Sequence, residues 1–130
     1  MTQKPVELIL MRQLASYLAT PIFVVNPAGS LLFYNEPAEA LLGRRYEESG
    51  EMPFEEWSTI FAPTAEDGSP LTPDALPLTI ALEKHRSVHR ALRIRGLDGV
   101  TRRIEVTAFP LEGQGGRQVG AVAIFWEEDR

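Results

Sequence analysis

The hydrophobic positions near the start of the chain recur with the period of an α-helix. Nine apolar residues between Val6 and Ala19 fall in an arc of about 220° on a helical wheel, interrupted only by Glu7; they are Val6, Leu8, Leu10, Met11, Leu14, Ala15, Tyr17, Leu18 and Ala19. A helix that covers one surface needs a stripe about half that wide, so we expect this helix to contact two surfaces. Thr20 and Pro21 end it, because proline disfavours helical geometry in the residue before it.

Five later segments carry the apolar pattern of β-strands. They lie at residues 22–25, 31–34, 88–95, 103–109 and 119–126. The first two flank a turn that contains Pro27 and Gly29, which predicts a hairpin. The third and fourth alternate between apolar and polar positions, whereas the last is apolar almost throughout, as in strands buried on both faces. Pro110 is expected to end the fourth strand.

Short helices are predicted between the hairpin and the last three strands. One covers about 35–42, with Asn35 as its N-cap and Gly43 ending it. Two more cover about 53–61 and 77–84, where apolar residues recur at helical spacing. The order of helix, hairpin, short helices and three-stranded meander indicates an α+β fold.

The composition limits the classes of function. With 130 residues, the chain has room for one domain, which we place at 20–130 after an N-terminal amphipathic helix at 1–19. A net charge of −5 argues against nucleic acid as a partner, because phosphate binding needs a basic surface. No apolar run approaches the ~18 residues that span a bilayer, and the N-terminus does not resemble a secretion signal. We therefore expect a cytoplasmic protein that does not enter a membrane.

The candidate catalytic patterns all have simpler explanations. Glu55 and Glu56 are adjacent, so on a helix they point about 100° apart and cannot act on one substrate as an acid/base pair. The glycine-rich segment 113–116 leads into a strand rather than a helix, so it lacks the helix dipole of a phosphate-binding loop. The sequence has no Cys, no zinc-ligand spacing and no Ser/His/Asp order. We expect no enzyme activity, no catalytic residues and no metal site.

Three stretches of the sequence, taken in order and at their spacing, resemble the PAS family of sensor domains. Residues 20–43 resemble the opening hairpin and first helix of that family, including the Asn at the start of the helix. Residues 67–84 resemble its Asp-Gly loop and Pro-Leu helix start, and residues 98–125 resemble its last two strands. The family's exit motif, Asp-Ile-Thr, is replaced here by residues 127–130, Glu-Glu-Asp-Arg.

The resemblance implies a five-stranded antiparallel sheet in the order 2-1-5-4-3, with the short helices on one face. In this family, the hollow between sheet and helices holds haem, flavin, an organic acid or nothing. Signals then leave through terminal helices, often to a histidine kinase, a cyclase or a transcription regulator. The resemblance therefore predicts a sensory or signal-transduction domain that works on such an effector.

The histidines and the lack of cysteine restrict the cofactor. Haem needs an axial ligand that faces the hollow, but His85 and His89 are both expected at the surface, which disfavours haem. A covalent flavin adduct is excluded because the chain has no Cys. A flavin held without a covalent bond stays open, and Trp57 could stack on it, although Trp57 also fits a core position.

The side chains that line the hollow follow from strand alternation. If Val122 and Ile124 point inward, then Val106 and Ala108 do so beside them, while Ala121, Ala123 and Phe125 face outward. The predicted lining is Phe23, Val25, Trp57, Phe61, Leu78, Leu82, Leu92, Ile94, Val106 and Val122. This lining is almost wholly apolar, so we expect a ligand that is apolar or contains a ring.

The outer face of the sheet would also be apolar, and helix 1–19 is its natural cover. The remaining apolar surface of the helix is expected to pack on a second copy of the chain, through Leu10, Met11, Leu14 and Leu18.

Two alternatives to a ligand-binding sensor stay open. One is a pure protein-interaction module whose side chains fill the hollow. The other is a small α+β enzyme of the isomerase type, which the apolar inward positions support only weakly.

Overall fold

The computed structural model describes residues 6–43 and 50–127, and within them the elements follow the predicted order. Residues 128–130, in the segment that departs from the family's exit motif, lie outside this description. The helices and strands are α1 (Val6–Ala15), β1 (Ile22–Val25), β2 (Leu31–Tyr34), α2 (Glu36–Leu42), α4 (Phe54–Ile60), α5 (Pro77–Lys84), β3 (Val88–Arg95), β4 (Thr101–Glu112) and β5 (Gln118–Glu127). Short 3-10 turns lie at Pro73–Ala75 and Gln114–Gly116.

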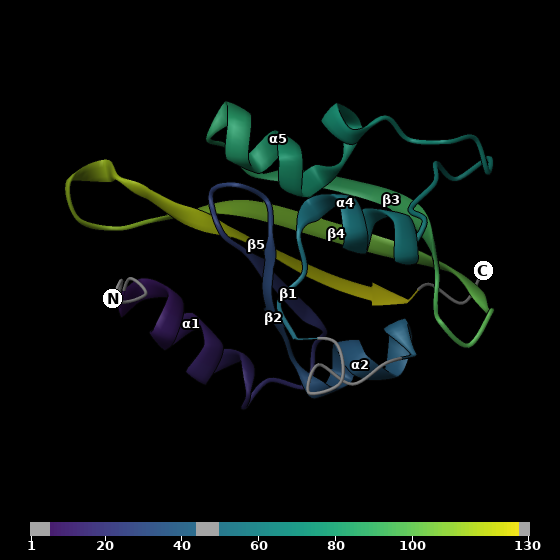
Figure 1. Ribbon diagram of the computed structural model, residues 1–130, viewed down its shortest axis with the longest axis horizontal. Helices are drawn as coiled ribbons and strands as arrows, with labels where there is room; N and C mark the ends of the chain where they lie inside the picture. The colour runs from purple at the N-terminus through teal and green to yellow at the C-terminus, as the bar shows by residue number, and fades with distance from the viewer. Residues whose placement is uncertain (1–5, 44–49, 128–130) are drawn as a thin grey trace.

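The five strands form one antiparallel sheet in the order β2-β1-β5-β4-β3, which confirms the predicted topology. The last strand in the sequence is therefore the middle strand of the sheet. Helices α4 and α5 lie on one side of the sheet and α1 lies on the other (Figure 1). No helix in residues 6–43 and 50–127 is long and apolar enough to cross a membrane.

Two apolar clusters lie on opposite faces of the sheet, as the alternation along β1 shows. Phe23 and Val25 join α2, α4 and α5 in the larger cluster. Ile22 and Val24 join Leu8 in the smaller cluster beneath α1. Because successive side chains of a strand point to opposite faces, the sheet separates the two clusters.

The side chains of β5 point opposite to the predicted directions. Val106 of β4 pairs with Phe125, and cross-strand partners share a face of the sheet. Val122 and Ile124 consequently lie in the cluster under α1, where we had expected inward positions. The residues that face α4 and α5 instead are Ala121, Ala123 and Phe125. A strand that is apolar on both faces gives no alternation from which its direction could be predicted.

Helix α1 is shorter than predicted, and β4 is longer. The helix ends at Ala15, and beyond it Leu18 donates a 3-10-type hydrogen bond to the Ala15 carbonyl at 3.2 Å. Strand β4 continues through Pro110 to Glu112. Strand β3 pairs with β4 only as far as Ala108, so at Pro110 strand β4 has a neighbouring strand on one side alone, where a sheet tolerates proline.

Candidate functional site

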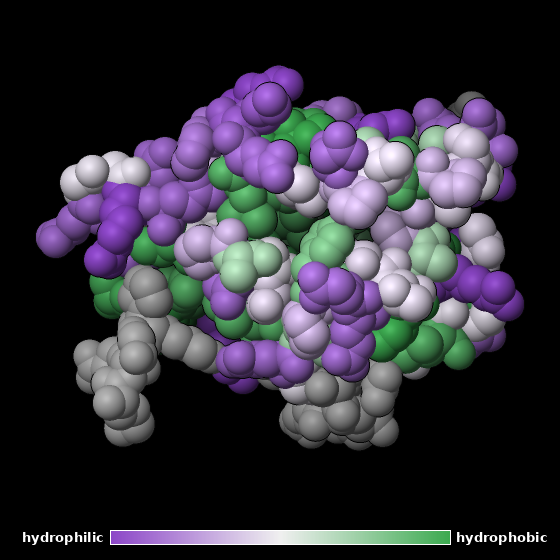
Figure 2. Space-filling view, turned by 45° about the horizontal axis from the view of Figure 1, so that its top comes forward, coloured by the Kyte–Doolittle hydropathy of each residue, from purple (hydrophilic) through white to green (hydrophobic). Residues whose placement is uncertain are grey.

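A hollow of about 80 Å³ lies between the inner face of the sheet and the helical layer. Strands supply one wall, while α4, the segment after it and the start of α5 supply the other. Figure 2, turned so that the α5 side comes forward, shows apolar atoms recessed among polar surface side chains. The lining consists of Phe23, Leu42, Trp57, Phe61, Pro63, Leu76, Pro77, Leu78, Leu92, Ile94, Ile104, Val106, Ala123 and Phe125.

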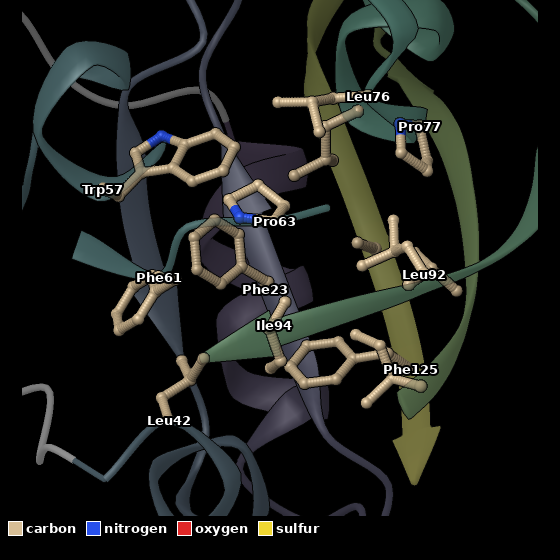
Figure 3. A pocket seen from close by; sticks show the side chains of 14 residues that line it. Phe23, Leu42, Trp57, Phe61, Pro63, Leu76, Pro77, Leu92, Ile94 and Phe125 are labelled. Atoms are coloured by element: carbon tan, nitrogen blue, oxygen red, sulfur yellow. The ribbon is translucent and has the colours of Figure 1, made fainter. Parts of the chain in front are cut away.

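Aromatic side chains form the wall of the hollow next to α4 (Figure 3). The Phe23 ring meets the Trp57 ring edge to face, with centroids 5.1 Å apart, and Phe61 approaches Phe23 in the same manner. The indole N–H of Trp57 donates to the Gly29 carbonyl oxygen at 2.9 Å. Trp57 is thus held in place by the hairpin turn, and its N–H is already used within the chain.

Seven of the ten predicted lining residues border the hollow, and three do not. Val25 lies in the same cluster but away from the hollow, and Leu82 packs half-buried against that cluster. Val122 faces α1, because the register of β5 reverses the expected direction. The seven that border it are Phe23, Trp57, Phe61, Leu78, Leu92, Ile94 and Val106.

The lining residues that the sequence reasoning missed fall into three groups. Ile104 continues the alternation of Val106 along β4, so its position was available from the pattern. Ala123 and Phe125 follow from the register of β5, which only pairing with its neighbours shows. The rest lie in or beside loops and helix ends, where the sequence has no periodic signal. They are Leu42, Pro63, Leu76 and Pro77.

The hollow can hold a small uncharged group. Its lining side chains are hydrocarbon apart from the indole of Trp57, so an anion or a cation would lose its hydration without replacement. Its volume of about 80 Å³ is roughly half that of an engineered apolar cavity of about 150 Å³ that binds benzene. Cofactor pockets usually measure about 300–1,000 Å³. A flavin or a haem would therefore require the walls to move apart.

Both histidines lie away from the hollow. His85 ends α5 in a left-handed conformation and is exposed. His89 lies on the outer face of the sheet, where its ring nitrogens approach Glu105 Oε1 at 2.7 Å and Thr107 Oγ1 at 2.8 Å. Within residues 6–43 and 50–127, no three His, Asp or Glu side chains gather as metal ligands. Neither His85 nor His89 is placed to bind a haem iron in the hollow.

Helix α1 turns a largely apolar face away from the sheet. Leu10 is 57% exposed and Leu14 is 51% exposed, as the dimer prediction requires. Met11 differs, because it packs half-buried with Leu8 and Ala15 against the sheet. Leu18 is partly exposed but follows the end of the helix. Of the four predicted contact residues, Leu10 and Leu14 therefore point outward from the helix itself.

A family model described as PAS domain matches residues 19–127, which is most of the chain. No curated protein matches the sequence.

Solved structures of low sequence identity share the fold. The PAS domain of a Colwellia psychrerythraea protein superposes with a TM-score of 0.66 at 21% identity, covering 93% of this chain and 96% of that one. The PAS domain of Bordetella pertussis BvgS has a TM-score of 0.64 at 15% identity, over 95% and 87% of the two chains. The Rhodobacter sphaeroides LOV protein has a TM-score of 0.72 at 13% identity, over 97% and 70%.

Proposed function

Because the chain belongs to the PAS domain family, we propose that it is a sensory module that detects a small apolar ligand in the hollow. The observation that carries this proposal is the hydrocarbon lining of the hollow. The indole N–H of Trp57 offers a ligand no free donor, because it already donates to the Gly29 carbonyl. Burial of apolar surface is the interaction that such a wall offers a ligand. We assign no catalytic step to the site, since its lining side chains carry no acid, base or nucleophile.

Uptake of xenon, measured by ¹H–¹⁵N NMR shifts, tests the hollow directly. We expect xenon to shift the amide signals of residues around Phe23, Trp57 and Val106, because a dry apolar cavity of this size accepts an apolar atom. Val106→Trp should abolish these shifts by filling the hollow. Thr107→Trp is the matched control, because Thr107 is the next residue of β4 and faces the other side of the sheet. Benzene serves as a second probe, and its binding would show that the walls part for a ring.

A second candidate is a relay module whose hollow takes up no ligand, and the small volume of about 80 Å³ favours it. Wild-type protein that shows no shifts with either xenon or benzene would support this candidate and contradict the sensor. Equal loss of xenon binding in the Val106→Trp and Thr107→Trp variants would also contradict a site in the hollow.

We further propose that two copies of the chain pair through α1 and pass the signal to an effector, such as a histidine kinase, a cyclase or a transcription regulator. The exposed apolar face of α1 supports pairing, because an apolar patch of this kind is costly to leave in water. One structural neighbour is the PAS domain of a nitrogen regulation protein, which supports a regulatory role.

Charged substitutions on α1 test the pairing. The double variant Leu10→Glu, Leu14→Glu should elute as a monomer on gel filtration, because association would bury unpaired carboxylates. The matched control is Leu97→Glu, Val100→Glu, which alters two residues of similar exposure in the β3–β4 turn. That control should elute as a dimer. A folded α1 variant that elutes with the wild type would disprove pairing through this face.

A further inference from the structure

Residues 62–70, which follow α4, form a strap along the outer edge of β3. Strand β3 lies at one edge of the sheet. The Thr64 N–H donates to the Arg93 carbonyl at 2.8 Å, and the Arg93 N–H donates to the Thr64 carbonyl at 2.9 Å. These two hydrogen bonds satisfy backbone groups that an edge strand otherwise leaves unpaired. The strap is therefore attached to β3 through its backbone.

The strap closes the hollow beside β3. Pro63 of the strap lines the hollow, as do Leu92 and Ile94 of β3 (Figure 3). Arg93 lies between these two β3 residues and points to the opposite face of the sheet, as does its cross-strand partner Thr64. The pair of Thr64 and Arg93 therefore joins two walls of the hollow without lining it. Separation of this pair would open the hollow at the edge of the sheet.

An ion pair fastens the strap on the far face of the sheet. Ile104 and Val106 of β4 line the hollow, so Arg103 lies on the opposite face. Arg103 Nε donates to Glu66 Oε2 of the strap at 2.8 Å, and Arg103 Nη2 lies 2.7 Å from the same oxygen. Arg103 Nη2 also lies 3.4 Å from Glu105 Oε2. The strap thus passes around the edge of β3, from the hollow to the outer face.

The strap is less firmly anchored than the helices that form the rest of this wall. Every residue from 62 to 70 is exposed or half-buried, so little apolar surface holds the strap in place. By contrast, α4 buries Trp57 and α5 buries Leu78. Ala62 at the start of the strap has a φ of 43°, a left-handed conformation that is unfavourable for a residue with a Cβ atom. The strap is therefore the part of the wall that separates most easily.

We propose that this strap is the gate of the hollow: it separates from β3 to admit the ligand, and the ion pair between Glu66 and Arg103 keeps it closed. The inference rests on the proposed sensor function and adds the route by which the ligand enters. Both side chains of the ion pair are partly exposed, so the pair contributes little stability and leaves the strap able to open. Salt weakens such a pair, so entry should become faster as the ionic strength rises.

A cross-link between the strap and β3 tests the gate. The variant Thr64→Cys, Arg93→Cys places two thiols on hydrogen-bonded partners, whose Cα atoms lie about 5.5 Å apart in an antiparallel pair. The chain has no other Cys. Dibromobimane should join the two thiols, whereas iodoacetamide modifies both and leaves them separate, which makes it the matched control.

The rate of xenon exchange, measured by ¹²⁹Xe saturation-transfer NMR, compares the two forms. Xenon should exchange at least about 10-fold more slowly with the joined form than with the control, because the gate can no longer open. The Kd for xenon should stay within about 3-fold, because xenon fits the hollow while the strap is closed. A slower rate at an unchanged Kd distinguishes a gate from damage to the hollow itself.

Glu66→Gln tests the ion pair. The substitution keeps the size of the side chain and removes its charge, so xenon exchange should become about 1.5- to 5-fold faster, as for loss of an exposed ion pair. Glu83→Gln is the matched control, because it removes the same charge from an exposed residue of α5 and should leave the rate unchanged. Added salt should speed exchange in the wild type but not in Glu66→Gln. Thermal unfolding verifies that each variant still folds.

Each outcome bears on a different proposal. A wild type that binds neither xenon nor benzene overturns the sensor, and the gate with it. Equal xenon exchange in the joined form and its control overturns the gate and leaves the sensor standing. Slower exchange in the joined form, without any effect of Glu66→Gln, supports the gate and overturns the role of the ion pair. Both effects together support the whole inference.

Discussion

Asn35 shows how one buried side chain joins segments that are distant in the sequence. Its Oδ1 accepts hydrogen bonds from the Ile22 N–H at 2.9 Å and from the Ala38 N–H at 3.3 Å. Its Nδ2 donates to the carbonyls of Ala15 and Thr20, each at 3.0 Å. The end of α1, the start of β1 and the start of α2 are therefore fixed to one amide group.

Replacing Asn35 by Asp would separate the two halves of this network. The carboxylate keeps acceptors for Ile22 and Ala38 but loses both donors, so the Ala15 carbonyl keeps only its bond from the Leu18 N–H and the Thr20 carbonyl loses its bond from Asn35. We expect the free energy of unfolding to fall by about 1–3 kcal/mol, as for one buried polar group left unsatisfied. Urea denaturation measures the change, and native-state hydrogen exchange should show the largest increase in α1. A loss below about 0.5 kcal/mol would contradict this role.

At this scale the sequence predicted local roles and missed long-range ones. The N-cap of Asn35 was predictable, because the capped N–H of Ala38 lies three residues away. Its bond to Ala15 spans twenty residues and has no sequence signature. Trp57 follows the same rule, since its helix was predicted but its bond to Gly29 was not.

The β3–β4 turn holds the carboxyl end of α2. The Leu97 N–H donates to the Leu42 carbonyl at 2.8 Å, and Arg102 Nη1 donates to the Leu41 carbonyl at 3.1 Å. These bonds satisfy carbonyls that a helix end leaves free, and the Arg102 charge suits the negative end of the helix dipole. The Asp98 carboxylate holds Arg102 in this position, with 3.1 Å between Asp98 Oδ2 and Arg102 Nη2.

The Asp98 contact should appear in the pH dependence of stability. The hydrogen bond from Arg102, aided by the Val100 N–H, lowers the pKa of Asp98 below its ordinary value of 3.8. A carboxyl whose pKa is lower in the folded state stabilises the fold above its unfolded-state pKa, and this stabilisation is lost as the pH falls. The wild type should therefore exceed Asp98→Asn in stability at pH 6, with a gap that shrinks below about pH 4. Urea titrations at several pH values that show a constant gap would refute this linkage.

For whole elements, prediction succeeded where one face of a strand is polar. Strands β3 and β4 alternate, so Leu92, Ile94 and Val106 were placed correctly toward the hollow. In β5 both faces are apolar, and hydrophobicity alone could not distinguish Val122 from Ala123. The pairing of Val106 with Phe125 settles the direction, and that pairing is a tertiary property.

For the whole molecule, the resemblance to one family was enough to predict the sheet, but not the size of the hollow. The strand order follows from the resemblance of three sequence stretches to one family, and the structure confirms it. The volume of about 80 Å³ depends instead on how aromatic rings from β1 and α4 interlock. Such packing depends on three-dimensional contacts, so the volume cannot be predicted from residue type and spacing.

Strand β5 lies at the centre of the sheet, and both of its faces are packed against apolar clusters. Ala123 and Phe125 border the hollow, while Val122 and Ile124 lie in the cluster beneath α1. A bulky replacement on either face of β5 displaces the same backbone, so it disturbs the packing on both sides of the sheet. A substitution in this strand must therefore suit both clusters, which leaves fewer tolerated residues than either cluster alone would allow.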